Sequence, residues 1–117
     1  MEFKEQKPIY LQIADRICEE VLLGQYPVGE RLPSVREYAA LVEVNVNTVV
    51  RTYDWLSQKE VIYNKRGLGY FVADAATDII RSLHRDEFFN KQLPDLFRTM
   101  RNLGITMDEV IQQYEAQ

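Results

Sequence analysis

Two helix-start signals close together constrain this chain more than any other feature of its sequence. Ser34 and Glu37 have the S-x-x-E spacing of a capping box, in which each side chain bonds the other residue's backbone N–H. A second start signal follows at Asn45, and Val49 and Tyr53 behind it share one apolar face. The first helix must therefore be short, with a tight turn before the second. This pattern predicts a helix-turn-helix.

A longer helix is expected ahead of this pair. Pro8 can open it, because the N–H that proline lacks would have no partner there. Gly24 can end the helix in a left-handed conformation. Cys18 lies on its apolar side and is interpreted as a buried structural thiol, since one cysteine cannot form an internal disulfide. The apolar stripe consists of Ile9, Ile13, Ile17 and Val21.

A small β-hairpin is expected after the helix-turn-helix. The β-prone triplets Val61–Tyr63 and Tyr70–Val72 surround a basic, glycine-containing turn at 64–69. A hairpin in this place is a wing. The fold class predicted is therefore mainly α with a small β-hairpin: a winged helix-turn-helix over residues 1–74, followed by a short helical tail over 75–117.

The tail is expected to form a dimer. Pro94 should break its helical pattern, Gly104 should end the next helix, and Thr106 and Glu109 have capping-box spacing again. Three short helices cannot enclose so many large apolar side chains by themselves. We expect them to pair with a second chain, the alternative being that they pack on their own first domain. The expected interface residues are Ile80, Leu83, Phe88, Phe89, Leu96, Phe97, Met100 and Leu103.

Charge gives no independent indication of a nucleic-acid binder. The formal net charge is −4, whereas DNA-binding proteins are often basic. The charge is unevenly spread, however, because residues 31–66 carry more basic than acidic side chains and residues 73–117 the reverse. The sequence has no long apolar run and no apolar stretch at its start, so a cytoplasmic protein with no membrane contact is expected.

Catalysis is not expected. His84 is the single histidine, no cysteine cluster accompanies it, and no nucleophile–base pair is evident. The glycines at 67 and 69 lack the following lysine of a phosphate loop. Asp86 and Glu87 are adjacent on a helix and diverge, which is typical of a solvated face. The sequence therefore predicts neither an enzyme nor a metal or cofactor site.

Residues 8–72 resemble the DNA-binding domain of the GntR family of bacterial regulators. The resemblance rests on L-P-S-x-R at 32–36, V-N-x-N-T-V at 44–49, Tyr53, and R-G-x-G-x-F-V at 66–72. The V-N-x-N-T-V form and the closing segment 100–111 are similar to the YtrA-like subfamily, which has an unusually short C-terminal part. The resemblance implies a transcriptional regulator, often a repressor, that controls nearby transporter genes.

The sequence departs from the wider family at several positions. Val46 and Val50 stand where arginine is common, so two guanidinium contacts available to relatives are absent. Glu60 stands at a position usually held by glycine, and Leu68 at one usually held by lysine in the wing. The operator of a relative therefore cannot be transferred to this chain.

The expected DNA contacts follow from how a helix enters the major groove, with its N-terminal side chains facing the base edges. Alternatives stay open for several: Asn45 could serve only as a cap, Arg36 could pair with Glu37 or Glu43, and Val46 could touch a thymine methyl or pack on neighbours. The basic wing residues could be a solvated turn. The expected DNA-binding residues are Arg36, Asn45, Val46, Asn47, Thr48, Arg51, Lys65, Arg66 and Gly67.

The function expected is that of a sequence-specific regulator binding double-stranded DNA as a homodimer, on an inverted-repeat operator. The alternative is a winged-helix module that binds protein and does not touch DNA, which the acidic net charge favours. The tail is too small to enclose a usual ligand pocket within one chain. An unidentified small-molecule effector would therefore need a site between two chains.

Overall fold

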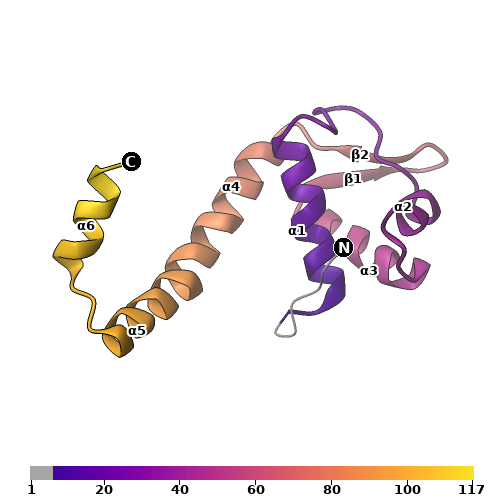
Figure 1. The fold of residues 1–117 in the computed structure, drawn as a ribbon. Coiled ribbons are helices and arrows are strands. Elements are labelled where there is room, and N and C mark those ends of the chain that lie inside the picture. Colours follow the sequence, from indigo (N-terminus) through magenta and orange to yellow (C-terminus); the bar gives the residue numbers. More distant parts are fainter. Residues whose placement is uncertain (1–6) are drawn as a thin grey trace. The chain divides into compact units, whose positions relative to one another are not determined.

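The first helix, α1 (Ile9–Leu22), forms one side of a small apolar core in the computed structural model, which describes residues 7–117 (Figure 1). Ile13, Ala14 and Ile17 have no exposed surface, as the four-residue apolar spacing predicts. Pro8 is the N-cap, and Gly24 (φ +82°) follows the helix in the left-handed conformation. The expected helix is therefore confirmed.

The two closely spaced helices are α2 (Val35–Val42) and α3 (Val46–Gln58), and both start signals are confirmed. The Ser34 hydroxyl accepts from the Glu37 N–H at 3.1 Å, and the Glu37 carboxylate accepts from the Ser34 N–H at 3.0 Å. Glu43 ends α2 in the left-handed conformation (φ +58°), which turns the chain sharply before α3 begins.

The wing is an antiparallel pair of strands, β1 (Ile62–Lys65) and β2 (Gly69–Val72). Its turn is shorter than expected, because Lys65 pairs with Gly69 in the ladder and only residues 66–68 lie outside it. The Lys65 carbonyl accepts from the Leu68 N–H at 2.9 Å and closes this turn. The segment before α2 runs beside β2, where the Leu32 N–H donates to the Tyr70 carbonyl at 2.8 Å.

The core of this part of the chain lies between α1, α2, α3 and the hairpin. Besides the α1 residues, its fully buried side chains come from α2, α3, the strands and the connecting loops. Thr52 is the polar member, and its hydroxyl donates to the Tyr10 carbonyl at 2.8 Å. These side chains are Leu32, Tyr38, Val49, Thr52, Tyr53, Leu56, Val61, Ile62 and Val72.

The chain divides into two compact units, Met1–Arg81 and Ser82–Gln117, and the division falls inside α4 (Ala76–Glu87). Ala76 and Ile80 belong to the first unit and have no exposed surface. The expectation for Ile80 therefore needs correction. Its side chain is already enclosed by its own chain, so it offers no surface to a partner. Residues 1–81 form the first unit and residues 82–117 the second unit.

The second unit is entirely helical. After α4 come a π-helical stretch, η1 (Phe88–Gln92), then α5 (Leu93–Leu103) and α6 (Met107–Glu115). The expected break at Pro94 is not found; the chain stays helical through it. Proline cannot donate to the carbonyl four residues back, and its ring crowds that carbonyl. The preceding π turn, in which the Leu93 N–H donates to the Phe88 carbonyl, accommodates the proline. Gly104 (φ +67°) ends α5, and Thr106 caps α6.

Candidate nucleic-acid interface

The face of α3 that points away from the core carries polar side chains near the start of the helix. Val49, Thr52 and Tyr53 are buried on the opposite face. Asn47 and Arg51 are exposed on the outer face. The helix thus presents an amide and a guanidinium to a partner while its other side anchors it in the core.

Asn45 has a structural role at the start of this helix. Its side-chain oxygen accepts from the Asn47 N–H at 2.8 Å, which is the hydrogen bond of an N-cap. Asn45 is therefore a helix cap, and its amide NH2 group remains as a donor, so the cap bond is compatible with capping alone and with a DNA contact as well. Val46 and Thr48 are half-buried, so each offers only part of its side chain to a ligand.

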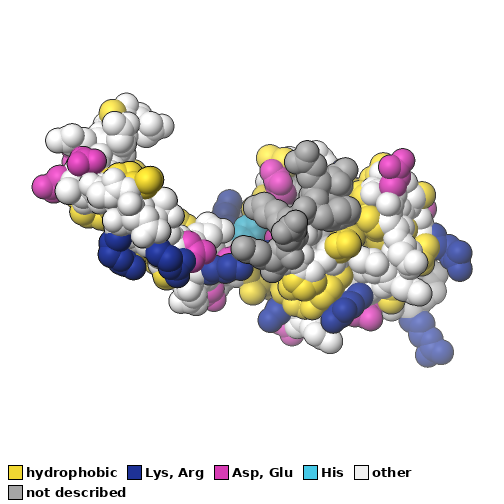
Figure 2. All heavy atoms as spheres, turned by 60° about the horizontal axis from the view of Figure 1, so that its bottom comes forward, with side chains coloured by type: hydrophobic (Ala, Val, Ile, Leu, Met, Phe, Trp, Pro, Cys, Tyr) yellow, Lys and Arg dark blue, Asp and Glu magenta, His cyan; other side chains and the backbone are white. Residues whose placement is uncertain are grey.

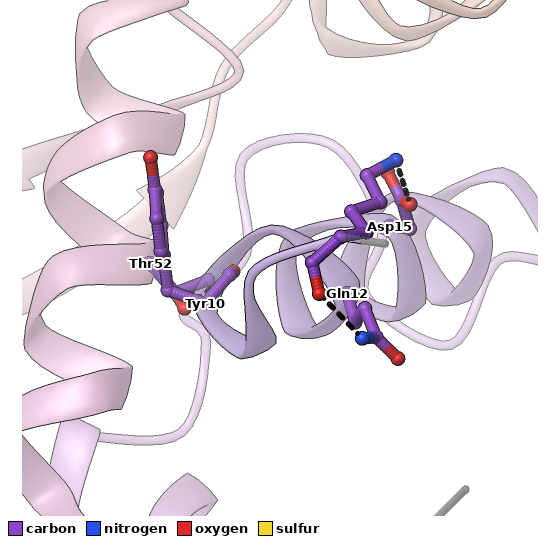
Figure 3. A network of polar contacts seen from close by, with 5 residues as sticks. Tyr10, Gln12, Asp15 and Thr52 are labelled. Atoms are coloured by element: carbon purple, nitrogen blue, oxygen red, sulfur yellow. Dashed lines mark hydrogen bonds and ion pairs between the residues drawn. The ribbon is translucent and has the colours of Figure 1, made fainter. Parts of the chain in front are cut away.

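Arg51 contacts an aromatic ring that sequence reasoning did not connect with it. Its guanidinium carbon lies 4.0 Å from the centre of the Tyr10 ring, in the first turn of α1. Figure 3 shows Tyr10 beside Thr52, the residue that follows Arg51 and donates to the Tyr10 carbonyl. Nearby, Gln12 donates to the Lys7 carbonyl and the Lys7 ammonium pairs with Asp15, also drawn in Figure 3. The spacing of these residues in the sequence gave no signal for the contact.

Arg36 is exposed in the first turn of α2, between the capping-box residues Ser34 and Glu37. The alternative of an ion pair with Glu37 or Glu43 is not found in the described part of the chain. The Glu37 carboxylate instead accepts from the Ser34 N–H, which lowers the pKa of Glu37. Arg36 is therefore available to an anionic partner.

The wing carries its basic residues in two different environments. Lys65 points to the same face of the hairpin as Tyr63 and Phe71, with its ammonium 4.8 Å from the Phe71 ring centre and 5.8 Å from that of Tyr63. Arg66 and Gly67 lie in the exposed turn, where Gly67 has φ +79°. The wing therefore offers a free guanidinium at its tip and an ammonium held over two aromatic rings.

A further basic residue, Arg31, lies against the wing and was missed by sequence reasoning. Its backbone forms a bridge with Phe71, and its Nε lies 3.1 Å from where a Cβ on Gly69 would stand. Glycine at 69, with φ +113°, thus leaves room for the exposed Arg31 side chain along the hairpin. The signal that could have found it is its place immediately before the L-P-S segment.

Tyr53 fixes α3 relative to the wing and to the loop before α2. Its hydroxyl donates to the Pro33 carbonyl at 2.7 Å, and its ring meets Tyr70 of β2 edge-on, with centres 5.0 Å apart. Burial raises the pKa of Tyr53, which keeps the hydroxyl protonated as a donor. Tyr38 packs beside it and donates to the Glu20 carboxylate of α1.

The surface charge is mixed. Figure 2 shows Lys and Arg side chains spaced along the edge of the molecule beside hydrophobic and acidic ones, with no single continuous basic field on this face. On this face the positive charge is therefore carried by separate Lys and Arg side chains. This arrangement is in keeping with the net charge of −4 and with readout by individual side chains.

Other candidate features of residues 7–117 are a metal site, a reactive cysteine and a membrane-spanning helix. No group of three or more His, Cys, Asp or Glu side chains in residues 7–117 is placed to hold a metal ion. Burial raises the pKa of the Cys18 thiol to about 12, so it stays protonated and unreactive at neutral pH. Among residues 7–117, no helix combines the length and apolar character that crossing a bilayer requires.

The chain is similar to bacterial transcriptional regulators along nearly its whole length. A family described as bacterial regulatory proteins, gntR family, matches residues 9–72. In Bacillus subtilis, the HTH-type transcriptional regulator YhcF is 37% identical, covering 95% of this chain and 90% of YhcF. The HTH-type transcriptional repressor YtrA of the same organism is 30% identical, covering 92% of this chain and 82% of YtrA.

A solved structure shares both sequence and fold with this chain. A protein from Bacteroides thetaiotaomicron, described as a transcriptional regulator of the GntR family, is 50% identical and superposes with a TM-score of 0.79. The match covers 93% of this chain and 95% of that one. The combination of winged helix-turn-helix and C-terminal helices is thus shared with this regulator.

Proposed function

Because this chain belongs to the GntR family of bacterial regulatory proteins, we propose that it binds a specific operator through α3 and the wing, as a homodimer that represses transcription. The family is a class of DNA-binding transcriptional regulators and not of enzymes. The inverted-repeat operator, the homodimer and the repression of transcription are the parts of the proposal that go beyond membership of the family. YtrA, one relative, is named a repressor, which supports the last of them.

The observation that carries the proposal is the exposed polar face of α3. Asn47 and Arg51 project from the first two turns of a helix whose other face is fixed in the core. Asparagine pairs bidentately with adenine and arginine with guanine, and each good pair contributes about 1–3 kcal/mol of discrimination. We assign base reading to these two residues, with Thr48 and Val46 beside them in the groove.

The remaining cations are assigned to the sugar-phosphate backbone. Arg36 on α2 and Arg66 at the wing tip are exposed, and the planar guanidinium of arginine matches the geometry of a phosphate. Lys65 contributes charge beside them, and Gly67 lets the wing backbone approach closely. The Asn45 side-chain oxygen already accepts the Asn47 N–H as the cap of α3, so its amide NH2 group is the donor that we assign to a phosphate. Such contacts position the protein on the duplex without selecting a sequence.

We assign DNA binding to residues 1–74 and pairing of chains to 75–117. Six of the eight expected interface residues retain exposed surface in the single chain, whereas Ile80 and Met100 are buried within it. On α6, Met107, Ile111 and Tyr114 are exposed as well and extend the apolar surface. Two-fold pairing would present two copies of α3 to an inverted repeat.

The proposal is tested by selecting bound sequences from a random duplex library. We expect the native chain to recover an inverted repeat. Arg51→Ala should relax the preference at one position of each half-site, with a loss of about 1–3 kcal/mol on the selected operator. Arg36→Ala should weaken binding to all sequences and reduce the salt dependence. Arg101→Ala, which removes an equal charge from exposed α5, is the control and should behave as the native chain.

Three outcomes would contradict the proposal in whole or in part. Absence of any enriched sequence at low salt would favour the winged-helix module that binds protein. Enrichment of a single, unrepeated site would leave sequence reading intact but contradict the homodimer. A reporter gene placed behind the selected operator tests the direction of regulation, and increased expression would overturn repression.

A further inference from the structure

We propose that Tyr10, on α1, positions Arg51 for base contact and thereby sets the sequence preference of α3. The inference rests on the proposed function, because it concerns how the same helix reads DNA. Tyr10 itself lies in the first turn of α1, outside the helix-turn-helix, and is half-buried. It acts on the arginine and does not itself need to touch the duplex.

A hydrogen bond beside Arg51 holds the backbone of Tyr10 next to α3. Thr52 follows Arg51 on α3 and is fully buried. Its hydroxyl donates to the Tyr10 carbonyl at 2.8 Å, and the Thr48 carbonyl is a second, longer acceptor for the same hydrogen at 3.1 Å. The bond to Tyr10 holds the backbone of the first α1 turn against α3. The ring and the guanidinium therefore start from neighbouring backbone positions on two different helices.

The guanidinium lies over the ring, 4.0 Å from its centre, within the range of a cation–π interaction. Within residues 7–117 the Arg51 guanidinium makes no hydrogen bond and no ion pair. Its N–H donors are thus not committed to another side chain of the described structure. Arginine has five such donors in a rigid fork, which can meet the O6 and N7 atoms of guanine.

Contact with the ring should reduce the conformational freedom of the long side chain before DNA is bound. An exposed arginine samples many rotamers, and ordering it on binding lowers affinity. A side chain already resting on Tyr10 has less freedom to lose. The smaller loss of entropy strengthens the contact of Arg51 with its base and leaves the phosphate contacts elsewhere unchanged. Loss of the ring should therefore lower the sequence selectivity of binding.

The test compares three residues at position 10 in the full chain. Tyr10→Phe keeps the ring and should bind the selected operator within about twofold of the native chain. Tyr10→Leu removes the ring and should bind the operator about two- to fivefold more weakly, the equivalent of ~0.5–1 kcal/mol. Binding to an unrelated duplex should be unchanged. A third variant, with pentafluorophenylalanine at position 10, keeps the ring's shape but reverses its charge distribution, and should behave as Tyr10→Leu.

Coupling to Arg51 separates positioning from a merely structural role. In the Arg51→Ala background, Tyr10→Leu should cause no further loss on the operator. An equal loss in both backgrounds, or operator binding by the pentafluorophenylalanine variant equal to that of Tyr10→Phe, would overturn the inference. If the native chain prefers no sequence, the proposed function itself fails. If the native chain reads an operator and Tyr10→Leu reads it equally well, the inference alone fails.

Discussion

At the residue scale, the structure depends on a few aromatic side chains that link parts distant in sequence. Tyr53 is the main example, because its hydroxyl bonds the loop before α2 and its ring packs against β2. Tyr38 does the same between α2 and α1 through Glu20. The position of α3 relative to the wing therefore rests on individual side-chain contacts as well as on the apolar core.

Replacing Tyr53 by Phe should destabilise the protein by about 1–2 kcal/mol. The change removes the 2.7 Å hydrogen bond and leaves the Pro33 carbonyl without its partner, while the ring and its packing stay. Urea unfolding measures the loss. Tyr63→Phe is the matched control, since Tyr63 is 37% exposed, and it should leave the unfolding free energy unchanged. Equal stability of the two variants would show that the bond contributes nothing.

At the element scale, the ends of the helices are set by backbone conformation. α3 ends at Gln58 with Lys59 as its C-cap, and Glu60 follows with φ +64°, in the left-handed region that costs most residues energy. Its N–H donates to the Ser57 carbonyl, and the Val61 N–H donates to that of Leu56, so the chain turns directly into β1. Glycine, which the family resemblance implies at this position, adopts the left-handed conformation without that energy cost.

Glu60→Gly should therefore stabilise the protein, by about 0.5–1 kcal/mol. The gain is the relief of the left-handed backbone, reduced by the greater entropy of glycine in the unfolded chain. Chemical denaturation should show a higher midpoint at an unchanged slope. The neighbouring Lys59 has ordinary helical angles, so Lys59→Gly should lower stability. Destabilisation by both substitutions would mean that the Glu60 side chain makes a contribution larger than the backbone cost.

At the scale of the whole molecule, the two units differ in how much apolar surface they enclose. The first unit has a core of fully buried side chains. In the second unit, Phe89 is 52% exposed, Leu103 68% and Tyr114 81%. Met100 is the buried residue of α5. Large apolar patches left exposed in one chain are typical of protein–protein contacts.

Phe97→Glu should convert the proposed dimer to monomers, raising its dissociation constant by at least about 30-fold, as expected for an interface residue contributing ~2 kcal/mol or more. Operator affinity should fall with it, because two half-sites are no longer bound together. Sedimentation equilibrium measures the first effect. Asn102→Glu adds the same charge to the same helix outside the apolar stripe and is the control. A native chain that is monomeric at all concentrations would contradict the prediction.

The local features of this protein could be predicted from the sequence. The caps at Ser34 and Asn45, the stripe of α1 and the hairpin depend on residues within a few positions of each other, so their spacing determines them. The exposure of Asn47 and Arg51 follows from the same periodicity, because the opposite face of α3 is apolar. The winged helix-turn-helix follows from these elements in this order. The resemblance of the motifs indicates the family, and the family match over residues 9–72 confirms it.

Only the tertiary structure decided which residues meet across the fold. Several features join residues that are far apart in the sequence. They are the contact of Tyr10 with Arg51, the bond of Tyr53 to Pro33, the place of Arg31 beside Gly69 and the burial of Ile80. The physical reason is that a sequence pattern records which face of an element is apolar. It does not record which other element covers that face, or where a long side chain from a neighbouring helix comes to rest.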